Sequence, residues 1–352
     1  MDEFALSGQT IDLAHWLNCY AFDVIGNITY SRRFGFLDEG EDIGGIMAAL
    51  KKIGRYGSLV GIYNKLHPWL YALNEKIPGS GAAGRTYLMT FTRARIAERM
   101  EARRKTSYKA PVESMDEESD VPRDFLDKLA DRNQQDPSKI TPYDIFATGM
   151  SNIIAGADTT AISLASTMYH LITTPRVLLK LREEVAQHRG ETGRLSFKQT
   201  QDMPYLQLVI KEALRMHPAV GLPLWRVVPA GGAEVAGQFF PAGTRVGVNS
   251  WVTQYDAEVY GPDVYEFKPE RWEEKDTEKL QRMEANWIPF GLGSRTCLGR
   301  HISFLEMSKL IPGVVANFNY TMTMPKEQWK GNNFWFVKPE KLSVQVSKIK
   351  SV

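Results

Sequence analysis

The stretch Phe290-Gly-Leu-Gly-Ser-Arg-Thr-Cys-Leu-Gly-Arg300 places one cysteine, Cys297, among glycines and arginines. A lone cysteine is more often an ordinary buried thiol than a functional one. The alternative is a thiolate held open to a metal by backbone conformations that glycine permits. The spacing Phe-x-x-Gly-x-Arg-x-Cys-x-Gly favours this second interpretation, and its fixed positions are Phe290, Gly293, Arg295, Cys297 and Gly299.

The residues that follow the cysteine predict a helix. Apolar side chains recur at helical spacing from Ile302 to Val315, so we expect Cys297 just before a helix N-terminus, where free amides would stabilise a thiolate. Gly293 and Gly299 would permit a tight turn and the close approach of a flat ring. Arg295 could pair with a carboxylate through two hydrogen bonds, or it could be a solvated loop arginine.

The composition describes a globular protein without a strong charge. The 352 residues include 43% hydrophobic and 24% charged residues, with 43 Lys+Arg against 41 Asp+Glu, so nothing indicates a nucleic-acid or acidic partner. The basic stretch from Arg93 to Lys109 is interrupted by acids and predicts a solvated helix face. The two cysteines, Cys19 and Cys297, are too few for a disulfide framework and suggest a reducing compartment. No Cys-x-x-Cys or His-Glu-x-x-His spacing indicates zinc.

The first eight residues, Met1-Asp-Glu-Phe-Ala-Leu-Ser-Gly8, have neither a basic flank nor an apolar core. They therefore predict neither a signal peptide nor an anchor. No later run of about 18 apolar residues occurs. We expect a chain that does not span a membrane.

The first third of the chain predicts helices. Apolar periodicity indicates helices over residues 11–30, 43–60 and 82–104, and a bend around His67-Pro68 follows the second. Residues 105 to 124 become polar and acidic, which predicts an exposed connection. The length allows about two domains, or one large helical domain, and we favour a single domain over residues 1–352.

A second informative segment begins at Thr141-Pro142-Tyr-Asp144, which has the residues of a helix start. A helix of about thirty residues is expected to reach Thr174-Pro175. Its middle contains Ala155-Gly156-Ala157-Asp158-Thr159-Thr160. Gly156 costs about 1 kcal/mol relative to alanine there, so something needs close approach. The alternative is packing against a neighbouring helix, with threonine hydroxyls bonded to the preceding turn.

The last part of the chain mixes helices and strands. A helix carries Glu212-Ala-Leu-Arg215, which alone would be an ordinary surface pair. Short runs punctuated by Gly and Pro predict a small antiparallel sheet from strands at 224–228, 233–236, 238–240 and 244–248. The segments 334–337 and 342–346 predict the two strands of a hairpin.

Four motifs in order carry a resemblance to a known family. The loop from Phe290 to Arg300 resembles the haem-binding loop of the cytochrome P-450 family, the haem-thiolate monooxygenases. The segment 155–160 resembles the distal helix of that family, Glu212-x-x-Arg215 resembles its Glu-x-x-Arg, and Pro269-Glu270-Arg271-Trp272 resembles its Pro-Glu-Arg-Phe with Trp272 in place of Phe. The resemblance covers roughly residues 10–348 and is nearest to fungal members that modify secondary metabolites.

The resemblance implies a mainly α-helical fold with a small antiparallel β region, and a haem b whose iron is bound by the Cys297 thiolate. Phe290, Gly293 and Gly299 would shape the haem site, and Arg295 and Arg226 would pair with the haem propionates. Glu212, Arg215 and Arg271 would form a buried network that supports the haem loop and takes no part in catalysis.

The resemblance also assigns the substrate side of the haem. Asp158 and Thr159 would deliver protons during oxygen activation, while Gly156 would leave a groove for dioxygen and Thr160 would be accessory. The segment Ala219-Val220-Gly221-Leu222 would line the pocket, and Asn333 and Phe334 would face the substrate.

The implied reaction inserts one oxygen atom from O2 into an apolar small molecule, with electrons from an NADPH-dependent cytochrome reductase. The family is expected at the endoplasmic-reticulum membrane. Its members begin with an anchor, a small sheet and a helix bearing Trp and Arg, and nothing before Asp2 supplies them. We therefore expect a form that lacks the N-terminal third, is cytoplasmic or peripheral, and binds haem substoichiometrically. A non-catalytic haem-binding remnant, and a metal-free helical protein in which Cys297 is merely buried, stay open as alternatives.

Overall fold

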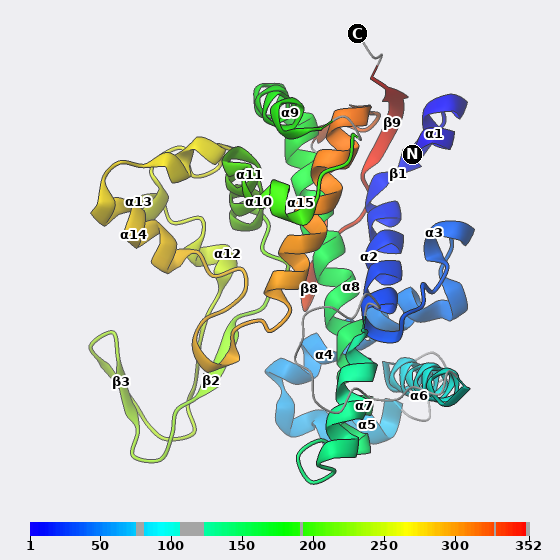
Figure 1. The fold of residues 1–352 in the computed structure, drawn as a ribbon. Helices are drawn as coiled ribbons and strands as arrows, with labels where there is room; N and C mark the ends of the chain where they lie inside the picture. Colours follow the sequence, from blue (N-terminus) through cyan, green and yellow to red (C-terminus); the bar gives the residue numbers. More distant parts are fainter. Residues whose placement is uncertain (75–80, 106–122, 191–192, 327–328, 350–352) are drawn as a thin grey trace. The chain divides into compact units, whose positions relative to one another are not determined.

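Helices make up most of the computed structural model, which describes residues 1–74, 81–105, 123–190, 193–326 and 329–349 (Figure 1). The chain divides into two units, residues 15–161 and residues 1–14 with 162–352, and the division falls within one long helix, α8 (Pro142–Thr173). The single domain over residues 1–352 stays a prediction. The acidic connection predicted at 105–124 lies, except at its ends, outside the described residues.

The unit of residues 15–161 is helical. Its elements are α2 (Leu13–Tyr30), α3 (Phe36–Glu39), η1 (Ile43–Gly45), α4 (Ile46–Ile62), η2 (Asn64–Leu66), α5 (His67–Asn74), α6 (Gly81–Lys105), α7 (Phe125–Gln135) and the first part of α8. The rings of Phe22 and Phe36 stack with centroids 4.7 Å apart at the centre of its apolar core. The buried Asp23 accepts hydrogen bonds from the amides of Gly35, Phe36 and Leu37, so α3 is fixed to α2 at its first turn.

The predicted helices of this unit are confirmed, and α8 has the predicted start, because the amide of Asp144 donates to Oγ1 of Thr141 at 3.2 Å. The bend after α4 was predicted at His67-Pro68, but these residues begin α5, and the break lies at η2. Proline is tolerated in the first turn of a helix because the amide hydrogen that it lacks would have no helical partner there.

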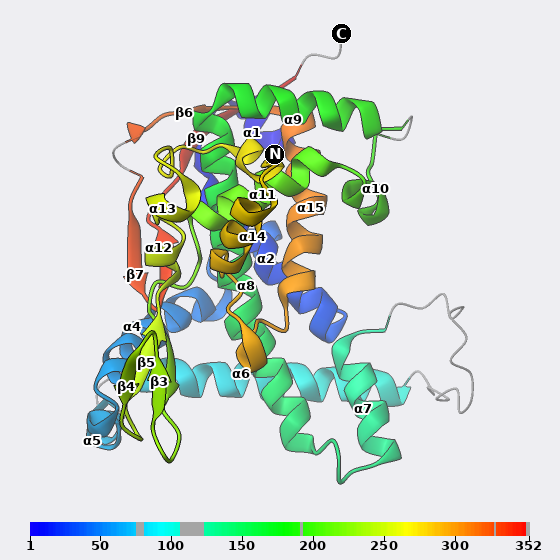
Figure 2. The same cartoon turned by 90° about the vertical axis from the view of Figure 1, so that its left-hand side faces the viewer.

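The prediction of a solvated basic face on α6 is wrong for two of its arginines. Arg99 donates to Asp124 and Asp127 at 2.6 Å each, and Arg103 pairs with Asp127 and Asp131. Figure 2 shows the two helices that these pairs join, α6 and α7. These side chains lie between α6 and α7 and are largely buried. Asp124 is the cap of α7, since its carboxylate accepts from the amide of Asp127 at 2.7 Å. The arginines turn inward because three carboxylates of α7 and its cap face them.

The second unit contains residues 1–14 and 162–352. Its helical elements are α1 (Asp2–Ser7), the end of α8, α9 (Pro175–His188), α10 (Phe197–Gln201), α11 (Pro204–Met216), α12 (Ser250–Thr253), α13 (Ala257–Tyr260), η3 (Pro269–Glu273), α14 (Thr277–Asn286), η4 (Gly293–Arg295) and α15 (Arg300–Asn317). A buried cluster that includes Tyr260, Trp272 and Met283 joins α13, η3 and α14. The predicted helix after Cys297 is confirmed as α15.

A three-stranded antiparallel sheet in this unit has the order β1-β9-β6, formed by β1 (Thr10–Asp12), β9 (Ser343–Lys348) and β6 (Phe318–Met322). Ile11 pairs with Val344, and Tyr320 pairs with Val346. The sequence placed Ile11 at the start of a helix, but that helix begins at Leu13. Ile11 lies in a strand because β1 pairs with β9, which follows it by more than 300 residues.

The four short strands from 224 to 248 are confirmed as β2 (Leu224–Val227), β3 (Ala233–Val235), β4 (Gln238–Phe240) and β5 (Arg245–Val248). They form two separate antiparallel pairs, β2 with β5 and β3 with β4, in place of one predicted sheet. Figure 1 shows both pairs along one two-stranded ribbon that extends from the helices around α12. Hydrogen bonds between Val228 and Gly243-Thr244 continue the pairing just past the end of β2 and before the start of β5.

The C-terminal hairpin was predicted with the wrong partners. The hairpin joins β7 (Gly331–Phe334) to β8 (Phe336–Pro339), so the predicted strand 334–337 is divided by a turn at Trp335. Trp335 has a φ of 72°, which is uncommon for a residue other than glycine, so the sequence gives no indication of a turn there. Residues 342–346 belong mostly to β9 in the other sheet.

No helix of the described ranges has the length and apolar character needed to cross a lipid bilayer.

Candidate functional site

The loop before α15 is held in shape by its own backbone. Gly291 and Gly293 have φ values of 69° and 68°, a left-handed conformation that side chains disfavour. The amide of Cys297 donates to the carbonyl of Phe290 at 2.8 Å, and the amide of Thr296 donates to the carbonyl of Gly293 at 3.1 Å. These two bonds present Cys297 at the end of a closed turn, as the glycine spacing predicts.

The thiol of Cys297 is exposed, so the alternative of a merely buried cysteine is wrong. Gly299 has an ordinary φ of −82°, and its backbone alone does not require glycine. A Cβ on Gly299 would meet one described atom, the Sγ of Cys297, at 4.0 Å. A methyl group here would lie at ordinary contact distance from the sulfur, so packing among the described residues does not require glycine either. Gly299 is also the N-cap of α15, and no side chain of the described residues caps that helix end.

Two arginines of the same unit have free guanidinium donors. Arg295 in η4 and Arg226 in β2 are both exposed, and neither forms an ion pair with a carboxylate of the described ranges. Arg226 donates to the carbonyl of Trp225 at 2.9 Å. A Cβ on Gly291 would lie 3.7 Å from Leu224, so β2 starts beside the Cys297 loop. Both arginines can therefore donate hydrogen bonds to a carboxylate of a bound molecule near this loop.

Aromatic side chains fix the loop to α15. The ring of Phe290 lies 6.0 Å from that of Trp287 and 5.5 Å from that of Phe304, measured between centroids. These three residues line an open cavity of about 940 Å³ that also contacts Phe197 of α10 and Arg300 of α15. Phe290 thus contributes to the site by packing, and its carbonyl orients Cys297.

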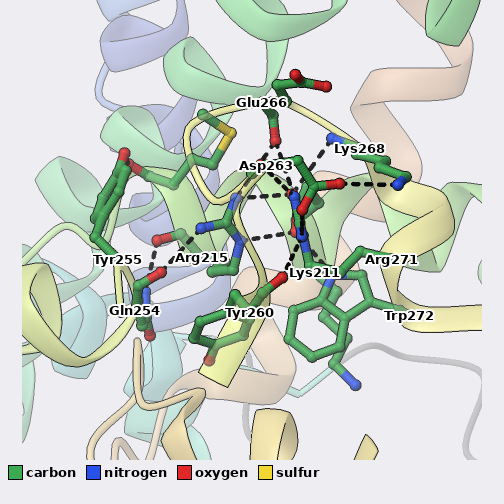
Figure 3. Close-up of polar contacts among 12 residues, drawn as sticks. Lys211, Arg215, Gln254, Tyr255, Tyr260, Asp263, Glu266, Lys268, Arg271 and Trp272 are labelled. Carbon is green, nitrogen blue, oxygen red and sulfur yellow. Dashed lines mark hydrogen bonds and ion pairs between the residues drawn. The ribbon is translucent and has the colours of Figure 1, made fainter. Parts of the chain in front are cut away.

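A buried ion network lies beside α11, as predicted (Figure 3). Glu212 and Arg215 have no exposed surface, and Arg215 donates to the two carboxylate oxygens of Glu212 at 2.8 and 2.9 Å. Arg271 of η3 donates to the same carboxylate at 3.3 Å and to carbonyls of Tyr260 and Asp263. A buried pair of this kind is stable only when its hydrogen bonds are satisfied, and here they are.

Two further residues extend the network. The indole Nε1 of Trp272 donates to Glu212 at 3.0 Å, so the tryptophan that departs from the family pattern supplies a donor that phenylalanine lacks. The carboxylate of Asp263 is partly buried, which raises its pKa, but hydrogen bonds from Lys268 and Arg271 outweigh burial and lower this pKa to about 2. Asp263 therefore stays ionised and balances the second arginine.

The middle of α8 belongs to the unit of residues 15–161 as far as Ala161. Asp158 is 2% exposed, and the hydroxyl of Thr159 donates to the carbonyl of Ala155 at 2.6 Å. A Cβ on Gly156 would lie 2.9 Å from two side-chain atoms of Ile25 in α2. On this side of the helix the space next to Gly156 is therefore filled by packing against α2, and the groove for dioxygen stays a prediction.

The contact between Gly156 and Ile25 gives a testable prediction. Alanine normally stabilises a helix interior by about 1 kcal/mol over glycine, but Gly156→Ala should destabilise this unit by about 1–3 kcal/mol because its methyl group overlaps Ile25. Chemical unfolding of Gly156→Ala, Ile25→Val and the double variant would measure the coupling. Gly156→Ala should lower the free energy of unfolding less in the Ile25→Val background than in the unsubstituted chain. Additive effects would contradict the overlap.

The segment Ala219–Leu222 is held against the β7–β8 hairpin. The amide of Gly221 donates to the carbonyl of Trp335, and the amide of Val337 donates to that of Ala219, each at 2.9 Å. The carbonyl of Gly221 accepts from the side-chain amides of Asn333 at 3.2 Å and Asn249 at 3.3 Å. A Cβ on Gly221 would approach the Asn333 amide within 2.5 Å. Asn333 therefore directs its side chain to Gly221, and we infer that it positions this segment and does not itself face a substrate.

His217 ends α11 just before that segment and is buried. Its Nε2 lies 2.9 Å from the carbonyl of Val337, so this nitrogen carries the proton and donates. Burial lowers the pKa of His217 to about 4, because it disfavours the charged ring more than the hydrogen bond to Val337 favours it. The ring is neutral in the folded state at neutral pH.

Stability should consequently fall in mild acid. Below its ordinary pKa of 6.5, His217 binds a proton in the unfolded chain but not in the folded one, so the free energy of unfolding decreases as the pH falls from 6.5 towards 4. One such histidine contributes a slope of about 1.4 kcal/mol per pH unit. Urea unfolding between pH 7 and 4.5 should show a smaller slope for His217→Phe and an unchanged slope for the exposed His301→Gln. Equal slopes in all three proteins would contradict the burial argument.

Two buried polar residues of this unit escaped the sequence interpretation. Glu306 of α15 is 1% exposed, and burial raises the pKa of its carboxyl to about 8. In the sequence, the one indication of an unusual role is that this acidic residue interrupts the apolar spacing of α15. Gln254, at the end of α12, has no exposed surface and lies in a segment without a motif.

The sequence-predicted site residues fall into two groups. The unit with residues 162–352 contains Cys297, its glycines, Phe290, both arginines and the complete buried network. Asp158 and Thr159 belong to the unit of residues 15–161. The structure thus brings the proposed metal ligand and its supporting residues together, and a common site with Asp158 and Thr159 stays a prediction.

Comparison with known proteins points to one family. The family model described as Cytochrome P450 matches residues 1–346. The chain is 42% identical over 326 residues to a cytochrome P450 monooxygenase of Aspergillus terreus, covering 90% of this chain and 63% of that protein. It is 39% identical to a pisatin demethylase of Fusarium vanettenii, covering 97% and 63%, and 36% identical to the cytochrome P450 monooxygenase cicH of Emericella nidulans, covering 97% and 67%.

These findings define a helical protein with a cysteine-bearing loop, matched by one family model over nearly all its length. The chain belongs to the cytochrome P450 family. It spans a little under two thirds of the length of the first two of these relatives.

Proposed function

We propose that this chain is the haem-binding part of a haem-thiolate monooxygenase that acts on an apolar small molecule. The observation that carries the proposal is the exposed thiol of Cys297, which is held in a glycine turn ahead of α15. A thiolate in that position can bind a metal ion, and the free amides of the helix end stabilise its charge.

The residues around the loop fit a haem. Cys297 would bind its iron, and Arg226 and Arg295 would pair with its two propionates, because both are exposed and have no carboxylate partner within the described ranges. Gly293 keeps the left-handed turn, and Phe290 packs the loop onto α15. A haem bound through a thiolate supplies the activation of O2.

The proton path of the proposal lies on α8. Asp158 is buried and Thr159 is hydrogen-bonded to the preceding turn, so both side chains have defined positions in an apolar helix. A carboxylate and a hydroxyl of this kind can pass protons while apolar neighbours exclude bulk water.

The electron source and the substrate complete the proposal. Electrons would come from an NADPH-dependent cytochrome reductase, at the endoplasmic-reticulum membrane expected for the family. The substrate class is an apolar secondary metabolite, supported by the fungal relatives, of which one is a pisatin demethylase. The reaction places one oxygen atom of O2 in the product.

A carbon monoxide spectrum tests the haem assignment. The chain is expressed with a haem precursor, purified, reduced and exposed to carbon monoxide. Thiolate binding gives a strongly red-shifted Soret band, and this band is the expected result. A chain without bound haem, or with a band of the histidine-bound type, would contradict the proposal. Turnover with a reductase then separates the enzyme from a haem-binding remnant.

Thr159→Ala tests the proton path. The variant should keep the red-shifted band and substrate binding, but a larger share of the reduced oxygen should leave as hydrogen peroxide. Hydrogen peroxide per NADPH oxidised is the measurement. Thr167→Ala is the matched control, because Thr167 makes the same bond to the preceding turn of α8, at 2.7 Å to Ser163. Equal peroxide yields in both variants would assign Thr159 to packing.

A further inference from the structure

Gln254 makes an unusually complete set of hydrogen bonds. Its side-chain Nε2 donates to the carbonyls of Leu214 at 3.1 Å and Arg215 at 2.7 Å, and its Oε1 accepts from the amide of Ile288 at 2.9 Å. Its backbone carbonyl accepts from the guanidinium of Arg215 at 2.9 Å. Figure 3 shows Gln254 beside Arg215, at the edge of the ion network. Because Gln254 has no exposed surface, water cannot replace these bonds if one of them is lost.

Ile288 is where the Cys297 loop begins. The carbonyl of Ile288 accepts from the amide of Gly291 at 3.0 Å, and the carbonyl of Phe290 accepts from the amide of Cys297 at 2.8 Å. The next residue, Pro289, has no amide hydrogen, so Ile288 supplies the backbone donor at this end of the loop. Gln254 therefore connects to Cys297 through two short backbone turns.

A second contact at the same place strengthens the connection. The indole of Trp287 donates to the carbonyl of Lys211 in α11 at 3.0 Å. Two consecutive residues, Trp287 and Ile288, are thus fixed to α11, one directly and one through Gln254. Helix α11 also carries Glu212 and Arg215. The ion network therefore fixes the same helix to which the start of the Cys297 loop is bonded.

We propose that Gln254 is a positioning residue for Cys297: it fixes the start of the loop to the end of α11 and so sets where the thiolate is presented. The inference rests on the proposed role of Cys297 as the haem ligand. A residue that only filled this space could be replaced by methionine, which has nearly the same length and shape but no amide group. The proposal instead requires the acceptor for Ile288 and the donor for α11.

Residue-resolved hydrogen exchange on the unsubstituted chain is the first test, and it needs no haem. The Ile288 amide should exchange as slowly as the amides of α11, because it is bonded to a fully buried acceptor. In Gln254→Met, the amides of Ile288 and Cys297 should exchange faster than in the unsubstituted chain. The increase should exceed, by at least about tenfold, the increase expected from the variant's loss of overall stability. Gln254→Glu should give an intermediate result, since a buried, protonated glutamic acid keeps one acceptor and one donor.

The matched control is Ile311→Val, a buried apolar change in α15 that lowers overall stability without touching Gln254. It should leave exchange in residues 288–297 unchanged beyond the effect of global unfolding. Rapid exchange of Ile288 in the unsubstituted chain would overturn the proposal. So would equal exchange changes in Gln254→Met and Ile311→Val.

The carbon monoxide spectrum is the second readout. Gln254→Met should lose at least half of the red-shifted, thiolate-type band in favour of a band without thiolate, while Ile311→Val keeps it. If the unsubstituted chain shows no thiolate-type band, the proposed function fails, but the exchange result still decides whether Gln254 holds the loop. If that band is present and persists unchanged in Gln254→Met, the positioning role fails and the proposed function stands.

Discussion

Replacing Cys297 with alanine or histidine should abolish the thiolate-type carbon monoxide band completely while the chain stays folded. The reason is that Cys297 is exposed in its turn and makes no packing contribution comparable to that of a buried side chain. The thiolate is the one ligand that the glycine turn presents, and alanine offers no donor atom while histidine offers a nitrogen. The measurement is the difference spectrum of the reduced protein, together with a far-ultraviolet circular dichroism spectrum that reports folding.

Cys19 supplies the control for this experiment. It is fully buried in the other unit, and burial, with the negative charge of Asp23 as a smaller cause, raises the pKa of its thiol to about 12. A thiol that is protonated and has no exposed surface is not presented to a haem, so Cys19→Ala should lower stability and leave the carbon monoxide band unchanged. If Cys297→Ala keeps the red-shifted band, the assignment of the ligand is wrong.

The second large effect concerns Arg215. We expect Arg215→Met to reduce the free energy of unfolding by about 3–5 kcal/mol, because it leaves the carboxylate of Glu212 buried without its closest partner. Chemical denaturation measures this loss. Arg176→Met is the matched control, since Arg176 pairs with Glu270 at 3.0 Å but is 57% exposed, and its loss should cost about 1 kcal/mol or less.

A double variant tests the reason for the loss. If an unpaired buried charge is the cause, Arg215→Met combined with Glu212→Gln should recover part of the stability, because the neutral amide needs no ionic partner. A double variant less stable than Arg215→Met would point to packing as the cause. The indole of Trp272 can donate to a carboxylate or to an amide oxygen, but its bond to the amide is the weaker one, so the recovery should be incomplete.

Local features of this chain could be predicted from sequence. The start of α8 at Thr141-Pro142, the turn before Cys297 and the helix after it depend on neighbouring residues, whose spacing is visible in the chain. The buried network was predicted because its motif has a fixed order, not because periodicity distinguishes it from a surface pair.

Features that depend on distant residues could not be predicted. Arg99 and Arg103 look like solvated residues until α7 brings three carboxylates opposite them. The strand β1 is set by pairing with β9 at the other end of the chain. Gln254 belongs to no motif, and its role depends on two carbonyls of α11 and one amide of the loop, which only the folded chain places within its reach.

The ion pairs between α6 and α7 have a consequence for how this unit tolerates change. Arg99 and Arg103 before the segment 106–122, and Asp124 and Asp127 after it, fasten the two ends of that segment to each other. The contacts that join α6 to α7 are thus made by residues on either side of the segment. A change in chain length between Lys105 and Arg123 would therefore leave these ion pairs in place.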